Sequence, residues 1–332
     1  MVVAIVGASV AGASLAYCLA KRGIEVVVYD KATFPRAKAC GEGLLPPGVD
    51  ALREMGLTPP DVPSVRGLRF VSGSDSVEAD FPAGHGLVVR RERFDAWLVA
   101  QARAAGAVIH EGTPAPDLDA DVIVAADGIH SRYADGRPDE PRRIGFSTHA
   151  DGIETGGRVE VRFCRDGELY LAPGGLAAAL MRADRFRAVD DGDAFRHLGL
   201  SITPTSPVLS MSPLGLDVRE IVRGNLLLIG DAAGAPDPIT GEGMSLALRS
   251  ALVAAEAIAR GRLEEYAAWR REEGDAVRRF GRLLLAMGRR AKTFVPRLRR
   301  RPEVLAQLVE VAVGRRRLGA IPIKSWLKLL AG

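Results

Sequence analysis

A glycine-rich turn near the start of the chain carries the clearest chemistry in the sequence. Its residues are Gly7, Ser9, Ala11, Gly12 and Asp30. The pattern GxSxxG follows a continuous apolar run. In dinucleotide-binding units such glycines let the backbone turn tightly, so that a pyrophosphate binds at the helix start near Ala11. Asp30 closes the next apolar run, where a carboxylate accepts hydrogen bonds from both ribose hydroxyls and disfavours a 2′-phosphate. The spacing therefore predicts a site for the adenosine of FAD or NAD rather than NADP.

One position of this turn departs from the usual pattern. Ser9 stands where a second glycine is typical. A small side chain is tolerated at this point, and we expect the pyrophosphate to lie slightly further from the backbone. The alternative interpretation is an ordinary strand–helix–strand turn that needs small residues for packing alone.

Two further motifs follow later apolar runs. Asp127-Gly128 comes after residues 121–125, and Gly230-Asp231 comes after residues 225–229. With the first turn, they resemble in order and spacing the single-Rossmann flavoprotein oxidoreductases with the para-hydroxybenzoate hydroxylase fold. Shorter segments narrow the resemblance, which extends to about residue 260, to the geranylgeranyl reductase-like branch. These segments are FPRxKxCGE at residues 34–42, RxxFD at residues 91–95 and DPxTGEG at residues 237–243.

The resemblance implies a set of FAD contacts. Beyond the first turn they are Arg36, Arg91, Asp127, Gly128, Gly230, Asp231, Pro238, Gly241, Gly243 and Met244. By this resemblance Asp231 hydrogen-bonds the ribityl chain. The helix that begins near Gly241 turns its N–H groups toward the flavin pyrimidine, where negative charge builds on reduction. Arg36 and Arg91 are implied near the phosphates and the ribityl chain. The alternatives are a helix cap for Asp231 and solvated loop charges for the two arginines.

Cys40 and Glu42 are the candidate catalytic residues. By the resemblance, their loop lies over the flavin, and the neighbouring Lys38 would favour the thiolate of Cys40. Cys40 is then either a proton donor or substrate contact, or a small apolar filler. Glu42 is either a general acid or an ordinary loop acid.

The apolar runs predict an α/β fold with a discontinuous Rossmann-like FAD-binding domain, because the first unit, the middle strand–helix segment and the Gly230-Asp231 segment share one sheet. Short alternating runs predict an inserted antiparallel β-sheet substrate domain, and residues 184–198 are expected to be helical. The expected bounds are residues 1–64, 87–142 and 217–275 for the FAD-binding domain, 65–86 and 143–216 for the substrate domain, and 276–332 for a basic helical C-terminal region.

Charge is distributed unevenly along the chain. The net charge is +4, yet residues 276–332 hold 15 Lys and Arg against two acidic residues. Three interpretations stay open for this region: an amphipathic anchor on a membrane surface, a docking site for an acidic carrier protein or a diphosphate head group, and a solvated helical face covering the nucleotide domain. Nucleic acid is not expected as a partner, because aromatic interleaving and a binding motif are both missing.

The cysteines and the apolar runs bear on the compartment. Three widely spaced cysteines and scattered histidines show no metal-ligand spacing and indicate a reducing environment. The sequence enters a strand at residue 2 without a signal peptide, and no run is long and apolar enough to span a membrane. We therefore expect a cytoplasmic protein, with peripheral membrane contact as the open alternative.

These features favour an enzyme, an FAD-dependent oxidoreductase acting on a hydrophobic, unsaturated small molecule. Reduction of a C=C bond is slightly favoured, with a proton supplied by Glu42 or Cys40. The electron donor stays open, and NAD(P)H acting transiently is one alternative. An NAD(P)H- and O2-dependent flavin monooxygenase, hydroxylating or epoxidising its substrate in biosynthesis, is the rival. A third alternative is a non-catalytic flavin-binding protein whose C-terminal region docks a partner.

Overall fold

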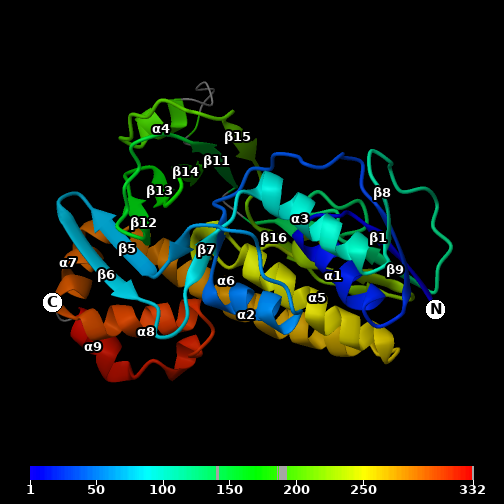
Figure 1. Ribbon diagram of the computed structural model, residues 1–332. Helices are drawn as coiled ribbons and strands as arrows, with labels where there is room; N and C mark the ends of the chain where they lie inside the picture. The colour runs from blue at the N-terminus through cyan, green and yellow to red at the C-terminus, as the bar shows by residue number, and fades with distance from the viewer. Residues whose placement is uncertain (140–141, 185, 187–192, 331–332) are drawn as a thin grey trace.

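The computed structural model describes residues 1–139, 142–184, 186 and 193–330 (Figure 1). A six-stranded sheet with its helices lies toward one end of the molecule, and a seven-stranded sheet backed by the C-terminal helices lies toward the other (Figure 1). This is the α/β architecture that the sequence predicts. Among the described residues, no helix combines the length and apolar character needed to cross a bilayer.

The six-stranded sheet carries the nucleotide motifs. Its strands, in spatial order, are β17 (Val222–Arg223), β18 (Leu226–Leu228), β9 (Val122–Ala125), β1 (Val2–Val6), β2 (Glu25–Tyr29) and β8 (Val108–His110). From β18 to β8 neighbouring strands are parallel, and β17 pairs antiparallel with β18. Helix α1 (Val10–Ala20) packs against α3 (Arg91–Ala104) and α5 (Gly243–Ala259). Their small and aliphatic side chains fill one core with the sheet.

The seven-stranded sheet is the inserted one. Its order is β15 (Leu209–Met211), β11 (Arg143–His149), β14 (Leu176–Arg182), β13 (Gly167–Ala172), β12 (Arg158–Phe163), β5 (Gly67–Ser72) and β6 (Asp75–Asp80). Neighbours are antiparallel, as expected, except that β5 and β12 are parallel. The hairpin of β5 and β6 comes from an earlier part of the chain and adds to the edge of the later strands.

Several short elements lie outside these two sheets. They are β3 (Gly43–Leu44), α2 (Pro46–Glu54), β4 (Ser64–Val65), β7 (Gly86–Val88), β10 (Gly136–Pro138), α4 (Asp193–His197), β16 (Leu216–Val218), η1 (Gly230–Ala233) and η2 (Pro238–Thr240). The middle segment does not lie wholly in the nucleotide sheet, because β7 pairs with β3 and β4 in a separate sheet. Of the helix expected at residues 184–198, α4 is described, whereas residues 185 and 187–192 lie outside the described residues.

The C-terminal region is helical, as expected. It comprises α6 (Leu263–Gly288), α7 (Ala291–Arg300), α8 (Pro302–Ala312), η3 (Leu318–Ala320) and α9 (Ile323–Leu330). Its position fits the third interpretation above only in part. Helices α7 and α8 pack on β5 and β6, and Leu305 and Leu308 are buried in one cluster with Phe70 and Val77. Much of the region from residue 276 onward therefore covers the inserted sheet (Figure 1). It also contacts the nucleotide domain, where Arg278 pairs with Asp217 and Arg317 pairs with Glu272 and Glu273. An amphipathic pattern identifies the buried face of a helix but not the element that covers it.

Candidate cofactor and substrate site

The sequence motifs meet at one edge of the six-stranded sheet. Strands β18, β9, β1 and β2 are parallel neighbours, so the loops that follow them lie side by side at their carboxyl ends. The chain leaves β1 for β2 on one side and later adds β9 and β18 on the other, which makes β1 the topological switch point. Open α/β sheets bind their ligands in the crevice at this point. The Gly7, Asp30, Asp127 and Asp231 segments are brought together here.

The first glycine turn is closed tightly by backbone contacts. Gly7 has a φ of 101°, and a Cβ atom there would lie 2.4 Å from the carbonyl oxygen of Ala126. A Cβ atom on Gly12 would lie 1.8 Å from the carbonyl oxygen of Gly7. Both distances are far below van der Waals contact, so both positions require glycine. The start of α1 at Val10 and Ala11 lines the cavity described below.

The structure explains why Ser9 replaces the usual glycine. Its hydroxyl donates to Asp95 Oδ2 at 2.7 Å and accepts from Arg91 Nη2 at 2.7 Å. Arg91 and Asp95 form a buried bidentate pair, with Nε–Oδ1 and Nη2–Oδ2 distances of 2.8 and 2.9 Å. Burial alone would raise the pKa of Asp95, but the Arg91 guanidinium holds it below its ordinary value. Arg36 Nη2 lies 3.9 Å from the same carboxylate. The serine therefore ties the turn to α3, and the two predicted arginines lie beside it.

Asp30 is buried and oriented by the backbone. Its Oδ2 accepts from the Ala8 N–H at 2.7 Å and its Oδ1 from the Ala32 N–H at 2.8 Å. Each carboxylate oxygen can accept a second hydrogen bond, so both still have capacity for ribose hydroxyls. The preformed orientation fits the ribose contact predicted from the sequence.

Two polar side chains at the same edge, Asp127 and Lys38, are in surroundings that a bound nucleotide would make more favourable. Asp127 Oδ1 is buried and has no hydrogen-bond partner among the described residues, and its neighbour Gly128 lines the cavity. Lys38 also lines the cavity, and burial followed by repulsion from Arg91 lowers the pKa of its ammonium group. A phosphate beside Lys38 would reverse that shift. With the glycine cradle and Asp30, these groups fit FAD. Lys38 was considered in the sequence only as a neighbour of Cys40.

The Gly230-Asp231 segment forms the opposite wall. Asp231 lies in the first turn of η1, whose N-cap is Ile229, so Asp231 is not the helix cap considered above. Its carboxylate lines the cavity and has no hydrogen-bond partner among the described residues. Gly230 has a φ of 59°, and Gly241, with a φ of 70°, ends η2 just before α5. The cavity-lining residues of this wall include Gly230, Asp231, Pro238, Gly241, Gly243 and Met244.

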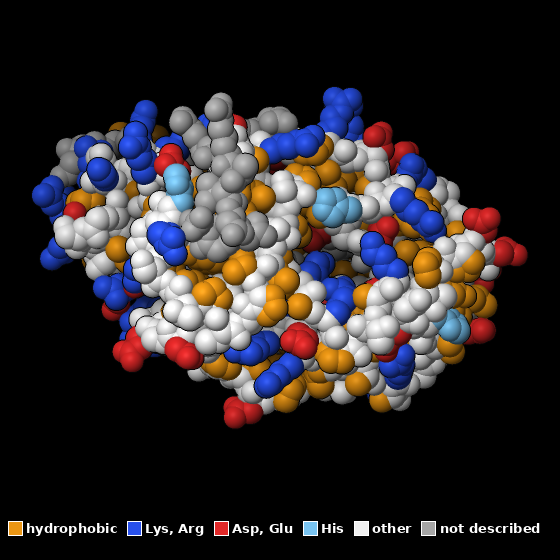
Figure 2. Space-filling view, turned by 90° about the horizontal axis from the view of Figure 1, so that it is seen from above, with side chains coloured by type: hydrophobic (Ala, Val, Ile, Leu, Met, Phe, Trp, Pro, Cys, Tyr) orange, Lys and Arg blue, Asp and Glu red, His pale blue; other side chains and the backbone are white. Residues whose placement is uncertain are grey.

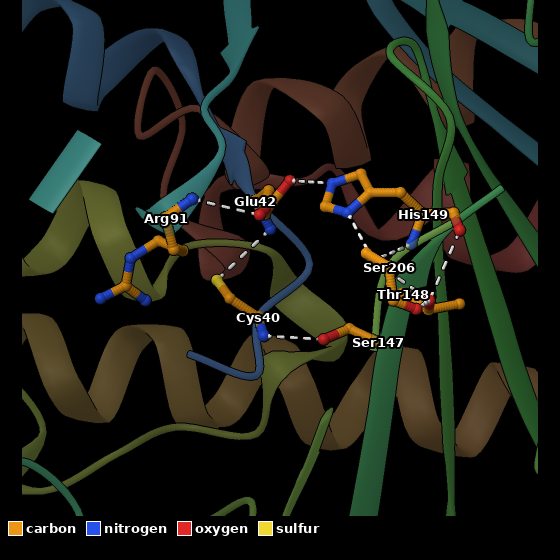
Figure 3. Close-up of polar contacts among 7 residues, drawn as sticks. All are labelled: Cys40, Glu42, Arg91, Ser147, Thr148, His149 and Ser206. Atoms are coloured by element: carbon orange, nitrogen blue, oxygen red, sulfur yellow. Dashed lines mark hydrogen bonds and ion pairs between the residues drawn. The ribbon is translucent and has the colours of Figure 1, made fainter. Parts of the chain in front are cut away.

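Cys40 and Glu42 lie together on one loop (Figure 3), and both line this cavity. The Cys40 N–H donates to Ser147 Oγ at 3.2 Å, and the Glu42 N–H donates to Cys40 Sγ at 3.3 Å. Glu42 has a φ of 51°, a left-handed conformation that non-glycine residues rarely adopt outside sites that impose it. Its Oε1 accepts from the Arg91 N–H at 3.1 Å, and its Oε2 lies 2.9 Å from His149 Nε2. His149 and Ser147 were not singled out from the sequence.

An apolar chamber continues from the nucleotide groove between the inserted sheet and the C-terminal helices. Its walls include Phe70, Val161, Tyr170 and Leu180 from the sheet, Leu284 from α6 and Leu308 from α8. Seen from above, the molecule is hollowed near the middle of its face, and Lys or Arg side chains are recessed in the hollow (Figure 2). The helical walls were missed in the sequence because an apolar helix face does not indicate which cavity it encloses.

The chain is similar to several known proteins. Residues 3–58 match the family described as FAD dependent oxidoreductase. The menaquinone reductase of Mycolicibacterium smegmatis is 30% identical over an alignment covering 80% of this chain and 78% of that protein. Digeranylgeranylglycerophospholipid reductase 1 of Methanothermobacter thermautotrophicus is 27% identical, with 84% of each chain covered. The solved structure of a flavin-dependent brominase superposes with a TM-score of 0.82 at 18% identity, covering 99% of this chain and 97% of that one. This last likeness is one of fold.

Proposed function

Because this chain belongs to the FAD-dependent oxidoreductases, the family it shares with the mycobacterial menaquinone reductase, we propose that it reduces a carbon–carbon double bond in a hydrophobic, unsaturated small molecule. The observation that carries the proposal is the apolar chamber that opens onto the nucleotide groove, with the buried carboxyl group of Glu42 at their junction. The digeranylgeranyl chains named for one relative are hydrophobic and unsaturated, and a polyprenyl chain of this kind suits the chamber.

Different residues of this chain have different roles in such a reduction. FAD, when bound, supplies the hydride equivalent that the double bond accepts. Glu42 donates the proton, because it lines the cavity and its side chain is only 8% exposed. Cys40, on the same loop, contacts the substrate. The aliphatic walls exclude water from the reacting carbons, and Lys38, Asp30 and Asp231 hold the cofactor.

The test of this function is anaerobic turnover with a polyprenyl substrate. The dithionite-reduced holoprotein is mixed with a geranylgeranyl lipid, and products are identified by mass spectrometry. We expect two added hydrogens per reduced double bond. A Glu42→Gln variant should form product about 10²-fold more slowly or worse, with cofactor reduction by the donor unchanged, because the loss of a positioned general acid has effects of this size. Cys40→Ala, which leaves the carboxyl group in place, should have a smaller effect.

The contrary outcomes identify the rivals. A product that gains one oxygen atom, formed in air with NAD(P)H and absent under argon, would make the protein a monooxygenase. Cofactor that no donor reduces, together with capture of a partner by the C-terminal region, would favour the non-catalytic alternative. Equal product formation by wild type and Glu42→Gln would reject Glu42 as the proton donor.

We also propose that helix α9 rests on an anionic lipid surface. Ile323 and Leu327, one turn apart, are 75% and 58% exposed, and Lys324 and Lys328 are exposed beside them. Apolar side chains flanked by lysines are typical of helices that lie in a membrane interface. Helix α9 packs on α8, which contributes Leu308 to the chamber wall, so a lipid substrate would have a short path inward.

A vesicle assay checks this surface. The full-length holoprotein should co-sediment with phosphatidylglycerol vesicles and much less with phosphatidylcholine vesicles. The double substitution Ile323→Asp and Leu327→Asp should weaken this binding at least about tenfold, because two apolar anchors are lost and two negative charges face the lipid. Val108→Asp is the matched control, since Val108 is 50% exposed on the edge strand β8. Wild-type binding by the double variant, or equal loss in the control, would contradict the proposal.

A further inference from the structure

His149 connects Glu42 to the protein surface. It is the last residue of β11, and its Nε2 lies 2.9 Å from Glu42 Oε2. On the other side of the imidazole, Nδ1 lies 3.1 Å from Ser206 Oγ, which also accepts from the His149 backbone N–H at 3.0 Å. Figure 3 shows the imidazole lying between the carboxylate and the serine. The three side chains therefore form one continuous chain of hydrogen-bonding groups.

This chain has two complementary hydrogen-bonding arrangements. In one, Ser206 Oγ donates to Nδ1, and Nε2–H donates to the Glu42 carboxylate. In the other, protonated Glu42 donates to Nε2, and Nδ1–H donates to Ser206 Oγ. The change from the first arrangement to the second moves a proton from His149 onto Glu42. At the other end, His149 takes a proton from Ser206, which regains one from solvent. Such alternation is what a proton relay requires.

The surroundings leave Glu42 with limited access to water. The side chain of Glu42 is 8% exposed, and that of His149 is 14% exposed. Ser206, in contrast, is half-buried between two exposed residues, Thr205 and Pro207, in the segment before β15. The outer end of the chain thus reaches solvent, whereas its inner end faces the cavity.

The other groups around Glu42 and His149 offer no second path for a proton to Glu42 among the described residues. From α3, Arg91 gives Glu42 a backbone N–H at 3.1 Å, while its guanidinium is bound to Asp95. From the loop, Cys40 Sγ accepts the Glu42 N–H. Adjacent to His149 on β11, Thr148 donates its hydroxyl to the Ser206 carbonyl oxygen at 2.8 Å and so fixes the serine segment. These contacts hold the carboxylate and the serine in position, and the imidazole is the group between them that can both give and take a proton.

We propose that His149 is a positioning and proton-relay residue that reprotonates Glu42 after each turnover, with Ser206 selecting the imidazole tautomer. The inference rests on the proposed reductase function. In each cycle the π bond of the alkene breaks and two C–H bonds form. One carbon takes a hydride with its electron pair from the reduced cofactor, which a reduced nicotinamide or dithionite regenerates. The other carbon takes the proton of Glu42, Glu42 regains it from His149 Nε2, and Nδ1 takes one from water through Ser206.

The first test needs no substrate. In the holoprotein labelled with ¹⁵N-histidine, the side-chain signals of His149, identified by their loss in His149→Ala, should shift in Glu42→Gln and in Ser206→Ala. The signals of the exposed His85 should stay unchanged. Insensitivity of the His149 signals to both substitutions would overturn the hydrogen-bonded chain whatever the reaction is.

The second test measures turnover. We expect His149→Ala to lower the steady-state rate of alkene reduction about 10- to 100-fold with bound FAD and melting temperature unchanged, and added imidazole to restore part of the rate in proportion to its concentration. His85→Ala should match wild type. A slow His149→Ala variant that imidazole does not rescue would overturn the relay and leave Glu42 as the donor. If Glu42→Gln turns over as wild type does, the donor assignment fails first, and the relay fails with it.

Discussion

Replacing Gly12 by valine is expected to yield protein that purifies without FAD, with the affinity for added FAD reduced more than about 10²-fold. A Cβ atom at this position would lie 1.8 Å from the Gly7 carbonyl oxygen and 3.1 Å from Ala126 Cβ. The nearest atom belongs to the backbone of the cofactor turn itself, so relief of the clash must move the start of α1 away from β1. That movement displaces the N–H groups that would face the pyrophosphate.

The absorbance of the purified protein near 450 nm and the quenching of flavin fluorescence on titration measure the effect. Gly23→Ala is the matched control. Gly23 follows the other end of α1 with a φ of 73°, but a Cβ atom there would meet nothing within 4 Å, so we expect about 1 kcal/mol of strain and normal FAD content. Should Gly12→Val fail to fold, Asp231→Ala gives the same answer without a clash. It removes a carboxylate whose charged hydrogen bonds contribute about 1.5–3 kcal/mol each. Yellow protein with wild-type affinity in both variants would reject the site.

The convergence of the candidate cofactor residues at one sheet edge could be predicted from the sequence because its determinants are local. Gly7, Gly12 and Asp30 lie within one strand–helix–strand unit, where backbone geometry and short spacing determine where each group points. The motifs after β9 and β18 were also predictable, because the carboxyl ends of parallel strands share an edge. Even the departure at Ser9 was visible, although its reason, a hydrogen bond to Asp95 on α3, was not.

The substrate half could not be predicted in the same way. His149 is one of five histidines and shows no motif spacing, yet it meets Glu42 across 107 residues of sequence. Similarly, Leu308 follows a helical apolar pattern that is equally compatible with packing on the nucleotide domain. The register of an inserted sheet and the packing of a helix depend on long-range complementarity, which one sequence does not display. The basic charge of the C-terminal region is visible in the sequence, whereas the partner of its apolar face, which builds one wall of the chamber, is not.

Replacing Arg143 by methionine is expected to lower the free energy of unfolding by about 3–5 kcal/mol, because it leaves the carboxylates of the buried Glu168 and the largely buried Asp237 without their cation. Arg143, at the start of β11, is 8% exposed. Its Nη1 lies 2.6 Å from Asp237 Oδ1, and its Nη2 contacts Glu168 on β13. Asp237 also caps η2 by accepting the Ile239 N–H at 3.0 Å, so the same arginine joins the inserted sheet to the cofactor segment. Weaker FAD binding should accompany the loss of stability.

Arg158→Met is the matched control for this substitution. Arg158 is equally buried at 8% exposure, but its partners Glu78 and Asp80 have side chains that are 49% and 50% exposed. Water can solvate those carboxylates once the arginine is gone. We therefore expect urea denaturation to show a much smaller decrease in the free energy of unfolding. Adding Glu168→Gln to Arg143→Met should recover part of the stability, since one of the two uncompensated charges is then removed.

The dependence on pH separates this electrostatic account from a simple packing defect. Burial raises the pKa of Glu168 to about 7, with Arg143 acting in the opposite direction, so removal of Arg143 must raise that pKa further. A carboxyl group whose pKa is higher in the folded than in the unfolded state binds its proton more tightly when folded. The contribution of this proton to stability is therefore complete below the pKa of the unfolded state. It is lost as the pH rises through the pKa of the folded state. The deficit of Arg143→Met relative to wild type should be smaller at pH 6 than at pH 8 and should nearly lose this dependence in the Glu168→Gln background. A deficit that is equal at both pH values, or equal to that of Arg158→Met, would show that the arginine acts through its packing alone.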